Sequence, residues 1–248
     1  MSQNMPEIKP KVIAHRGGCE WAPENTMAAF KRSLEFGADG IELDVQRCAS
    51  GELVVIHDVE ISRTTNGAGY LKDITYPELQ RLSAGSWFSE EFASERIPLL
   101  TEVLDLLEGK LTLHLEIKNA PVEYPGIEDD VLDVLSSYKY PHTVVISSFD
   151  HPLLKRVHEK APNQKLALLA DAYFLDVVGY AKQIGAETWH PGFGNLRKEA
   201  VEAAHNKGMI VNTWTLNKLR EWAFALAIKV DGVITNDPVG LTNFLQGL

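Results

Sequence analysis

The chain has 248 residues, of which 45% are hydrophobic and 23% are charged, so it can bury a sizeable core without disulfide or metal staples. The formal net charge of −10 argues against a nucleic-acid partner, since phosphate backbones are bound by basic surfaces. The two cysteines, Cys19 and Cys48, do not make a disulfide framework, and we expect both to be reduced thiols.

The N-terminal stretch, residues 1–11, is polar and contains Pro6 and Pro10. No apolar run follows it that is long enough for a signal-peptide core or a membrane span. We therefore expect a cytoplasmic protein without stable membrane association. Nothing in the pattern indicates an oligomeric state.

Short apolar, β-branched runs alternate with helical patterns along almost the whole chain. The predicted strands are Val12–His15, Gly40–Gln46, Leu111–Lys118, Thr143–Ser148, Leu166–Ala170, Glu187–Pro191, Met209–Trp214 and Gly232–Thr235. The predicted helices lie near Thr26–Phe36, Leu100–Glu108, Ile127–Tyr138, Pro152–Lys160, Phe174–Ile184, Arg197–Asn206, Lys218–Ala227 and Val239–Gln246. Eight strands, each trailed by a helix, predict an α/β protein with a closed parallel (β/α)8 TIM barrel, formed by residues 1–248 as a single domain.

Local signals mark several helix ends. Asn25 precedes the first predicted helix as an N-cap candidate, and Gly37 follows that helix as a C-terminal glycine. Asp150 with Pro152 opens the helix after the fourth strand, and Pro238 stands at the start of the last helix.

One stretch breaks the alternation of strands and helices. About fifty residues, from Arg47 to Pro98, separate the second strand from its helix, and they contain a further strand-like run, Leu53–Ile56. A structureless loop of this length would be unusual. We therefore expect an inserted subdomain at about residues 47–98, over the mouth of the barrel.

Carboxylates stand inside strands that should otherwise be apolar. Glu42 and Asp44 alternate in the second strand, and Glu116 lies near the end of the third, where barrel enzymes place their chemistry. Three converging carboxylates would repel one another unless a cation neutralised them. Oxygen ligands suit Mg²⁺ or Ca²⁺, with Mn²⁺ as a third candidate. The alternative is a salt-bridge network with nearby basic side chains, but the matching strand ends favour one divalent metal site.

Two histidines accompany these acids. His15 ends the first strand, and His57 follows the run Leu53–Ile56. Imidazole is the usual proton donor and acceptor near neutral pH, so both are candidates for acid–base work. The other six histidines are interpreted as structural residues, although His190 stands at a strand end from which it could line a pocket.

Cationic and aromatic side chains complete the candidate site. Arg16 offers a planar fork of donors for phosphate oxygens, and Lys118, alternating with Glu116, offers a point charge facing the barrel interior. Trp214 ends the seventh strand, where it is as well suited to a wall of the substrate pocket as to core packing.

Taken in order, the motifs resemble those of the glycerophosphodiester phosphodiesterases of the bacterial cytoplasmic type, from Val12 to about Pro238. The motifs are HRGG (His15–Gly18), PENT (Pro23–Thr26), ELDV (Glu42–Val45), VVIHD (Val54–Asp58), RTTNGAG (Arg63–Gly69), IPLL (Ile97–Leu100), LEIK (Leu115–Lys118), TWT (Thr213–Thr215) and GVITNDP (Gly232–Pro238). No single motif is decisive, but their joint order and spacing are highly specific.

The resemblance implies a (β/α)8 barrel that hydrolyses glycerophosphodiesters, as small-molecule substrates, to sn-glycerol 3-phosphate and an alcohol. It assigns the general acid–base pair to His15 and His57, and the divalent metal to Glu42, Asp44 and Glu116. It also places Arg16 and Lys118 on the phosphate, and it gives Asn25 a part in orienting the site.

The expected mechanism has one histidine deprotonate an attacking hydroxyl while the other protonates the departing alkoxide. The attacker is either water or the neighbouring glycerol hydroxyl, the latter through a cyclic phosphate. Two other functions remain open at this point: a phospholipase acting on phosphoinositides or sphingomyelin, and a non-catalytic phosphate-binding protein. The sequence carries no obvious membrane-docking segment, and every candidate catalytic group is present, which favours the hydrolase of soluble diesters.

Overall fold

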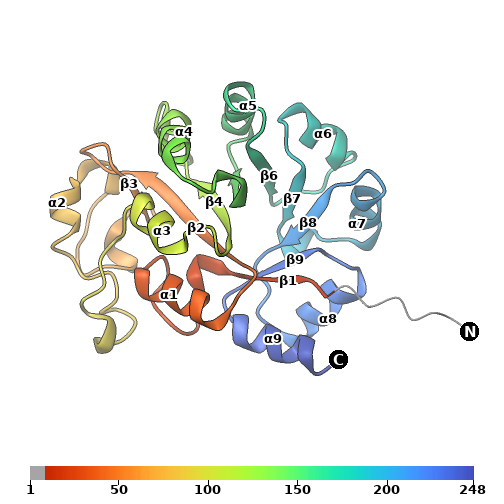
Figure 1. Ribbon diagram of the computed structural model, residues 1–248, viewed down its shortest axis with the longest axis horizontal. Helices are drawn as coiled ribbons and strands as arrows, with labels where there is room; N and C mark the ends of the chain where they lie inside the picture. Colours follow the sequence, from red (N-terminus) through yellow and green to blue (C-terminus); the bar gives the residue numbers. More distant parts are fainter. Residues whose placement is uncertain (1–8) are drawn as a thin grey trace, which may run out of the picture.

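The computed structural model describes residues 9–248, and its centre is a closed eight-stranded parallel barrel (Figure 1). The strands of the barrel are β1 (Lys11–Ala14), β2 (Gly40–Arg47), β4 (Thr112–Ile117), β5 (Val144–Ser148), β6 (Lys165–Ala170), β7 (Thr188–Pro191), β8 (Ile210–Thr213) and β9 (Gly232–Thr235). They are ordered β1-β9-β8-β7-β6-β5-β4-β2, and β1 closes the ring by pairing with β2. The predicted barrel is confirmed.

Helices surround this barrel and cover its outer face. They are α1 (Met27–Phe36), α3 (Leu100–Leu107), α4 (Ile127–Ser137), α5 (His151–Lys160), α6 (Val177–Gln183), α7 (Lys198–His205), α8 (Leu219–Ala227) and α9 (Pro238–Gln246). The outward-facing apolar side chains of the strands pack against the apolar faces of these helices in one large core cluster. Across residues 9–248, no helix has the length and the hydropathy that are needed to cross a membrane.

The first helix begins one residue later than expected, which corrects the prediction for Asn25. Thr26 is the N-cap, because its side-chain oxygen accepts a hydrogen bond from the Ala29 N–H. Asn25 has a φ of 56°, and its side-chain amide donates to Asp44 instead. The sequence pattern placed the N-cap one residue too early, because serine, threonine, asparagine and aspartate can each serve as an N-cap.

The other local signals for helix ends agree with the structure. Gly37 ends α1 with a φ of 77°, Asp150 caps α5 through the Leu153 N–H, and Pro238 is the first residue of α9. The helix predicted from Phe174 begins at Val177 in α6, because the side chain of Asp176 accepts the Gly179 N–H and fixes the start there.

Residues 48–99 connect β2 to α3, and we call them the β2–α3 segment. Strand β3 (Leu53–Val55) pairs antiparallel with the end of β2, with Val55 opposite Val45, so the segment is hydrogen-bonded to the barrel wall. The short helix α2 (Tyr76–Leu79) and several 3₁₀ turns follow beside β3 (Figure 1). The segment has an apolar cluster of its own: Cys48, Val54, Ile56, Ile61, Leu71, Leu79, Ala84 and Ile97.

Both cysteines carry free thiols. The Sγ of Cys19 lies 3.4 Å from the His15 carbonyl oxygen, and Cys48 lies in the β2–α3 segment with its Sγ 3.2 Å from a carboxylate oxygen of Glu52. Burial raises the pKa of the Cys19 thiol to about 12. A thiol of such high pKa is a poor nucleophile, which is consistent with a structural residue.

Gly17 shows how closely the first loop of the barrel approaches α1. Its φ is 81°, and a Cβ added there would lie 2.7 Å from the Cβ of Ala29 and 2.9 Å from the ring of Phe30. Gly37 has a similar φ of 77°, but a Cβ there would meet nothing within 4 Å. Substituting alanine at each glycine therefore distinguishes the cost of a left-handed backbone from the cost of a steric clash.

We predict that Gly37→Ala costs about 1–2 kcal/mol of the free energy of unfolding, the usual price of a left-handed alanine. Gly17→Ala should cost about 1–3 kcal/mol more, because it also overpacks the contact with α1. Urea denaturation of both variants measures the difference. Equal losses would mean that the loop can shift away from α1 at no cost.

Candidate active site

A cavity of about 110 Å³ opens at the carboxyl ends of the barrel strands. Seven of the nine predicted site residues line it: His15, Arg16, Glu42, His57, Glu116, Lys118 and Trp214. Ser147, Phe149, Leu169, His190, Thr215 and Ile234 complete the wall. The two remaining predicted residues, Asp44 and Asn25, are buried and hydrogen-bonded to each other. The structure thus brings together residues that are up to about two hundred positions apart in the chain.

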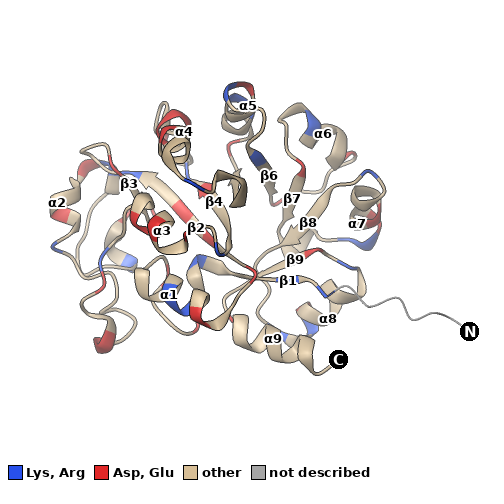
Figure 2. Ribbon diagram, viewed as in Figure 1, with Lys and Arg blue, Asp and Glu red and all other residues tan. Residues whose placement is uncertain are grey.

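The three predicted carboxylates converge because of the register between β2 and β4. Asp44 is opposite Glu116 in the parallel pair, and Glu42 points to the same side of β2, two residues earlier. One oxygen from each carboxylate lies within 4.8 Å of the others, and all three side chains are buried. Figure 2 shows these acidic positions within β2 and β4. A set of hard oxygen donors this close fits a divalent cation such as Mg²⁺ or Ca²⁺.

The protonation of the three carboxyls is unequal. Although burial works against its ionisation, Arg16, His57 and Lys118 hold the pKa of Asp44 down at about 2. Burial, with the charge of Asp44, raises the pKa of Glu116 to about 7 and places that of Glu42 well above its ordinary range. One carboxylate is thus firmly ionised, while the other two keep their protons more readily than a free glutamate does.

The two predicted cations lie against this acidic group. The Lys118 ammonium is 2.8 Å from Glu116 and 3.8 Å from Asp44, just past the end of β4. The Nε of Arg16 is 3.3 Å from Asp44, and its Nη1 donates to Glu24 at 2.7 Å. Lys118 and Arg16 both line the cavity, so they present positive charge to anything that binds there.

His15 is held through one ring nitrogen. Its Nδ1 is 2.6 Å from the side-chain oxygen of Asn236, at the end of β9, and its Nε2 is 3.8 Å from Glu42. The Asn236 backbone N–H donates in turn to Asn217 at 2.8 Å. Burial and the neighbouring Arg16 lower the pKa of His15 to about 4, so the ring is neutral near pH 7. With Nδ1–H donating to an amide oxygen, Nε2 carries the lone pair.

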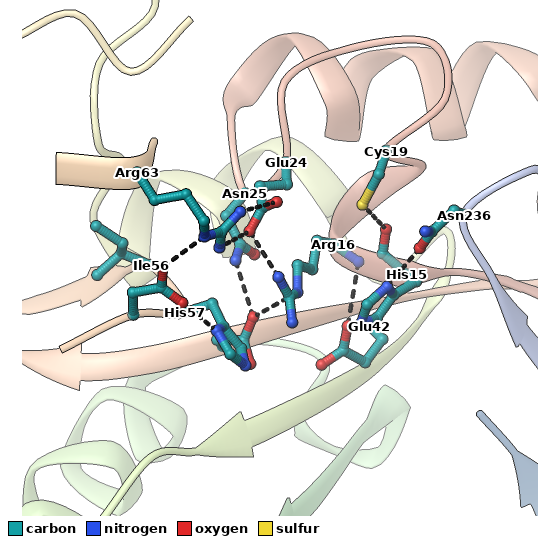
Figure 3. A network of polar contacts seen from close by, with 12 residues as sticks. His15, Arg16, Cys19, Glu24, Asn25, Glu42, Ile56, His57, Arg63 and Asn236 are labelled. Carbon is teal, nitrogen blue, oxygen red and sulfur yellow. Dashed lines mark hydrogen bonds and ion pairs between the residues drawn. The ribbon is translucent and has the colours of Figure 1, made fainter. Parts of the chain in front are cut away.

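His57 is held in the same way, but by a carboxylate. Its Nδ1 donates to Asp58 at 2.6 Å, and the second oxygen of Asp58 accepts from Arg63 (Figure 3). The backbone of this turn is fixed from below by Gln46 on β2. The single Nε2 amide of Gln46 donates to the carbonyls of Ile56, His57 and Asp58 at 3.0, 2.9 and 3.0 Å.

Ion pairs connect the β2–α3 segment with the first loop of the barrel. Glu24 is nine-tenths buried, and its carboxylate binds the guanidinium groups of both Arg16 and Arg63 (Figure 3). Although burial opposes ionisation, Arg63 and Arg16 hold the pKa of Glu24 below its ordinary value. The network runs without a gap from His57 through Asp58, Arg63 and Glu24 to Arg16.

Trp214 forms part of the cavity wall just past the end of β8. Its indole N–H donates to the His190 carbonyl at 2.9 Å, and its ring meets that of Phe149 edge to face at 5.7 Å. His190 also lines the cavity, and burial places its pKa well below the ordinary value. Its Nε2 is 3.4 Å from the side-chain amide of Asn212, which fits a neutral structural ring at the floor of the cavity.

Five residues that hold the site together were given no role from the sequence: Glu24, Gln46, Asp58, Arg63 and Asn236. All five carried a usable signal. Gln46 continues the alternation of Glu42 and Asp44, and the other four are polar members of the PENT, VVIHD, RTTNGAG and GVITNDP motifs. The contact of Asn236 with His15 could not be read from its motif, because only closure of the barrel brings the end of β9 next to β1.

A barrel with buried carboxylates, two cations and two oriented imidazoles at its carboxyl end is the arrangement of an enzyme. The model of the glycerophosphoryl diester phosphodiesterase family matches residues 15–239. A glycerophosphodiester phosphodiesterase of Caldanaerobacter subterraneus subsp. tengcongensis is 43% identical over 240 residues, which are 96% of this chain and 99% of that protein. The chain therefore belongs to the glycerophosphoryl diester phosphodiesterase family.

Solved structures agree with this assignment. A protein of Galdieria sulphuraria, described as a putative glycerophosphodiester phosphodiesterase, superposes with a TM-score of 0.88 at 30% identity, over 98% of this chain and all of that one. A phosphodiesterase of Oleispira antarctica has the same TM-score at 26% identity, over 96% of this chain and 97% of its own. The Oleispira protein was solved in complex with its product, sn-glycerol-3-phosphate.

Gln46 offers a direct test of how the His57 turn is supported. We predict that Gln46→Glu destabilises the protein by about 1–3 kcal/mol, because it removes a buried donor shared by three carbonyls. In the wild type, the Tyr124 hydroxyl donates to the side-chain oxygen of Gln46 at 3.0 Å, and the variant keeps an acceptor at this place. Chemical denaturation measures the loss, and Tyr124→Phe, which removes only that hydroxyl, is the matched control. An unchanged unfolding midpoint in Gln46→Glu would contradict the role of the amide.

Proposed function

We propose that the protein hydrolyses glycerophosphodiesters to sn-glycerol 3-phosphate and an alcohol, with a divalent cation and two acid–base histidines. One observation carries the proposal: two histidines, two cations and a cluster of three carboxylates lie together at one cavity. These residues are His15, His57, Arg16, Lys118, Glu42, Asp44 and Glu116. The product bound to the Oleispira protein supports the class of substrate. We also propose that residues 1–248 form one domain, in which residues at about 47–98 are an inserted subdomain that carries His57.

Glu42, Asp44 and Glu116 would hold the cation, Mg²⁺ or Ca²⁺ with Mn²⁺ as a third candidate. When bound, it neutralises negative charge on the phosphate oxygens as a Lewis acid. Arg16 and Lys118 bind the same phosphate from the cavity wall, and Asn25 orients Asp44 from behind. Trp214 contacts the organic part of the substrate.

The partners of the two histidines give them different roles. His15 donates from Nδ1 to a neutral amide, so its Nε2 is ready to accept a proton from the attacking hydroxyl. His57 donates to the Asp58 carboxylate, an anionic partner that fixes the orientation of the ring. We assign His15 as the general base of the first step and His57 as the acid that protonates the departing alkoxide.

The attacking hydroxyl comes either from water or from the adjacent glycerol hydroxyl. Attack by water breaks the bond between phosphorus and the alcohol oxygen in one step. Attack by the glycerol hydroxyl expels the same alcohol and forms a cyclic phosphate, which water then opens with the two histidines exchanging roles. Phosphorus NMR of a running reaction distinguishes the two routes, because only the second builds up a cyclic diester.

We predict that His15→Ala and His57→Ala each lower kcat for glycerophosphocholine by about 10²–10⁴-fold, since each removes a positioned proton carrier. The exposed His142, in the turn before β5, provides a control, and His142→Ala should keep wild-type rates. The assay is run on a panel of head groups after chelation and re-addition of each cation. Near-normal turnover in either of the two variants would refute the acid–base assignment, and preference for intact phospholipid vesicles would assign the protein to membrane substrates.

We predict that cation binding strengthens as pH rises. In the cation-free protein, Glu116 has a pKa of about 7 against an ordinary value of 4.5, so its proton stabilises the fold below about pH 4.5, and this contribution is lost as pH rises through 7. A cation must displace that proton, so it binds best to the ionised carboxylate at high pH. The rise in melting temperature on adding Mg²⁺ or Ca²⁺ should therefore be larger at about pH 8 than at about pH 5.

Glu116→Gln is the control for this measurement. The amide at this position has no proton to release. We therefore expect a smaller rise in melting temperature on adding the cation, without the increase with pH that ionisation of Glu116 causes in the wild type. A wild-type response of the same size at both pH values would contradict the metal site.

A further inference from the structure

Arg63 lies outside the barrel, at the end of a 3₁₀ turn (Ile61–Arg63) in the β2–α3 segment. The turn is anchored by Ile61, which is fully buried in the apolar cluster of that segment. The hydroxyl of Thr65 donates to the Ile61 carbonyl at 2.8 Å, and the Ile61 N–H donates to Gly69 at 3.1 Å. Arg63 therefore starts from a fixed backbone, although about half of its side chain is exposed.

The guanidinium of Arg63 uses three nitrogens on two carboxylates. Its Nη1 and Nη2 bind the two oxygens of Glu24 at 2.8 Å each, and its Nε donates to Asp58. Asp58 holds His57 through its other oxygen, and Glu24 holds Arg16 at 2.7 Å. We call Asp58 with His57 the first arm of this network, and Glu24 with Arg16 the second arm. Figure 3 shows the contacts of Arg63 with its neighbours.

We propose that Arg63 is a positioning residue for the reaction, acting on His57 through Asp58 and on Arg16 through Glu24. The inference rests on the proposed function, because it assumes that His57 transfers a proton and that Arg16 binds the phosphate. Through the first arm, Arg63 fixes the orientation of the Asp58–His57 pair, which bears on the chemical step. Through the second, it shares the charge of Glu24, so that Arg16 is not committed to this one carboxylate and can attract the anionic substrate.

The shape of the side chain matters as much as its charge. A guanidinium has five N–H donors in a rigid plane, and here one plane serves a bidentate contact and a third hydrogen bond. A lysine ammonium carries the same charge as a point and cannot hold both carboxylates in this geometry. Arg63→Lys should therefore behave much more like Arg63→Ala than like the wild type.

The test measures kcat and KM for glycerophosphocholine in Arg63→Ala, Asp58→Asn, Glu24→Gln and the two double variants that contain Arg63→Ala. Arg63→Ala should lower kcat and raise KM, with a combined loss of about 10–100-fold in kcat/KM, a part of the 10²–10⁴-fold that an acid–base group supplies. In the Asp58→Asn background the effect of Arg63→Ala on kcat should vanish. In the Glu24→Gln background its effect on KM should vanish.

A second measurement separates positioning from folding. Guanidinium ion at millimolar concentration should restore part of the activity of Arg63→Ala, because the partly exposed site lets it bind between the two carboxylates, while Arg63→Lys should gain nothing. Arg81, exposed in the same segment, supplies the matched control, and Arg81→Ala should keep wild-type kcat and KM. Melting temperatures of all variants identify those that are only unfolded.

Three results would overturn the inference: wild-type kinetics in Arg63→Ala, losses that multiply in both double variants, or a loss that follows melting temperature and is not rescued by guanidinium. The proposed function is judged separately in the same assay. If the wild type does not hydrolyse the diester, or if His57→Ala is fully active, the proposed function fails, whatever Arg63 does.

Discussion

The site depends on one buried negative charge, the ionised carboxylate of Asp44. Removing a carboxylate from water is costly, and this side chain is 1% exposed, so it stays charged only because Arg16, Lys118 and the Asn25 amide surround it. Burial and the charge of Asp44 together raise the pKa values of Glu42 and Glu116, so a second and a third ionisation nearby are more difficult. The ionisation of these two carboxyls therefore depends on Asp44 as well as on their own burial.

The barrel provides the geometry for that arrangement. Parallel strands in register place Asp44 beside Glu116 without any need for a loop to position them, and the same closure brings the end of β9 to His15. His57 differs, because it follows β3, a strand that belongs to the β2–α3 segment and runs antiparallel to β2. The two proposed proton carriers, His15 and His57, thus come from two sources, the barrel wall and the segment attached to it.

The sequence predicted the parts of this structure that have local or periodic signals. Alternating strands and helices indicated the barrel, and charged residues in apolar strands indicated the cavity that His15, Glu42 and Glu116 now line. What it missed are contacts between segments: the Asn236 side chain at His15, the three carbonyls bound by Gln46, and Arg63 between two acids. Such contacts depend on the way distant loops pack, and no spacing along one chain encodes them. The misplaced cap at Asn25 has the same origin, because its amide is engaged by Asp44, nineteen residues away.

The attachment of β3 to β2 also limits how this protein can change over evolution. A barrel without residues 48–99 would keep the carboxylates Glu42, Asp44 and Glu116. It would lose His57 and also Arg63, which binds Glu24. Exchange of this segment between related barrels has to transfer a turn whose arginine matches the glutamate of the recipient. We therefore expect the β2–α3 segment and the first loop of the barrel to change together in evolution. The helices that do not contact this segment are free to vary independently.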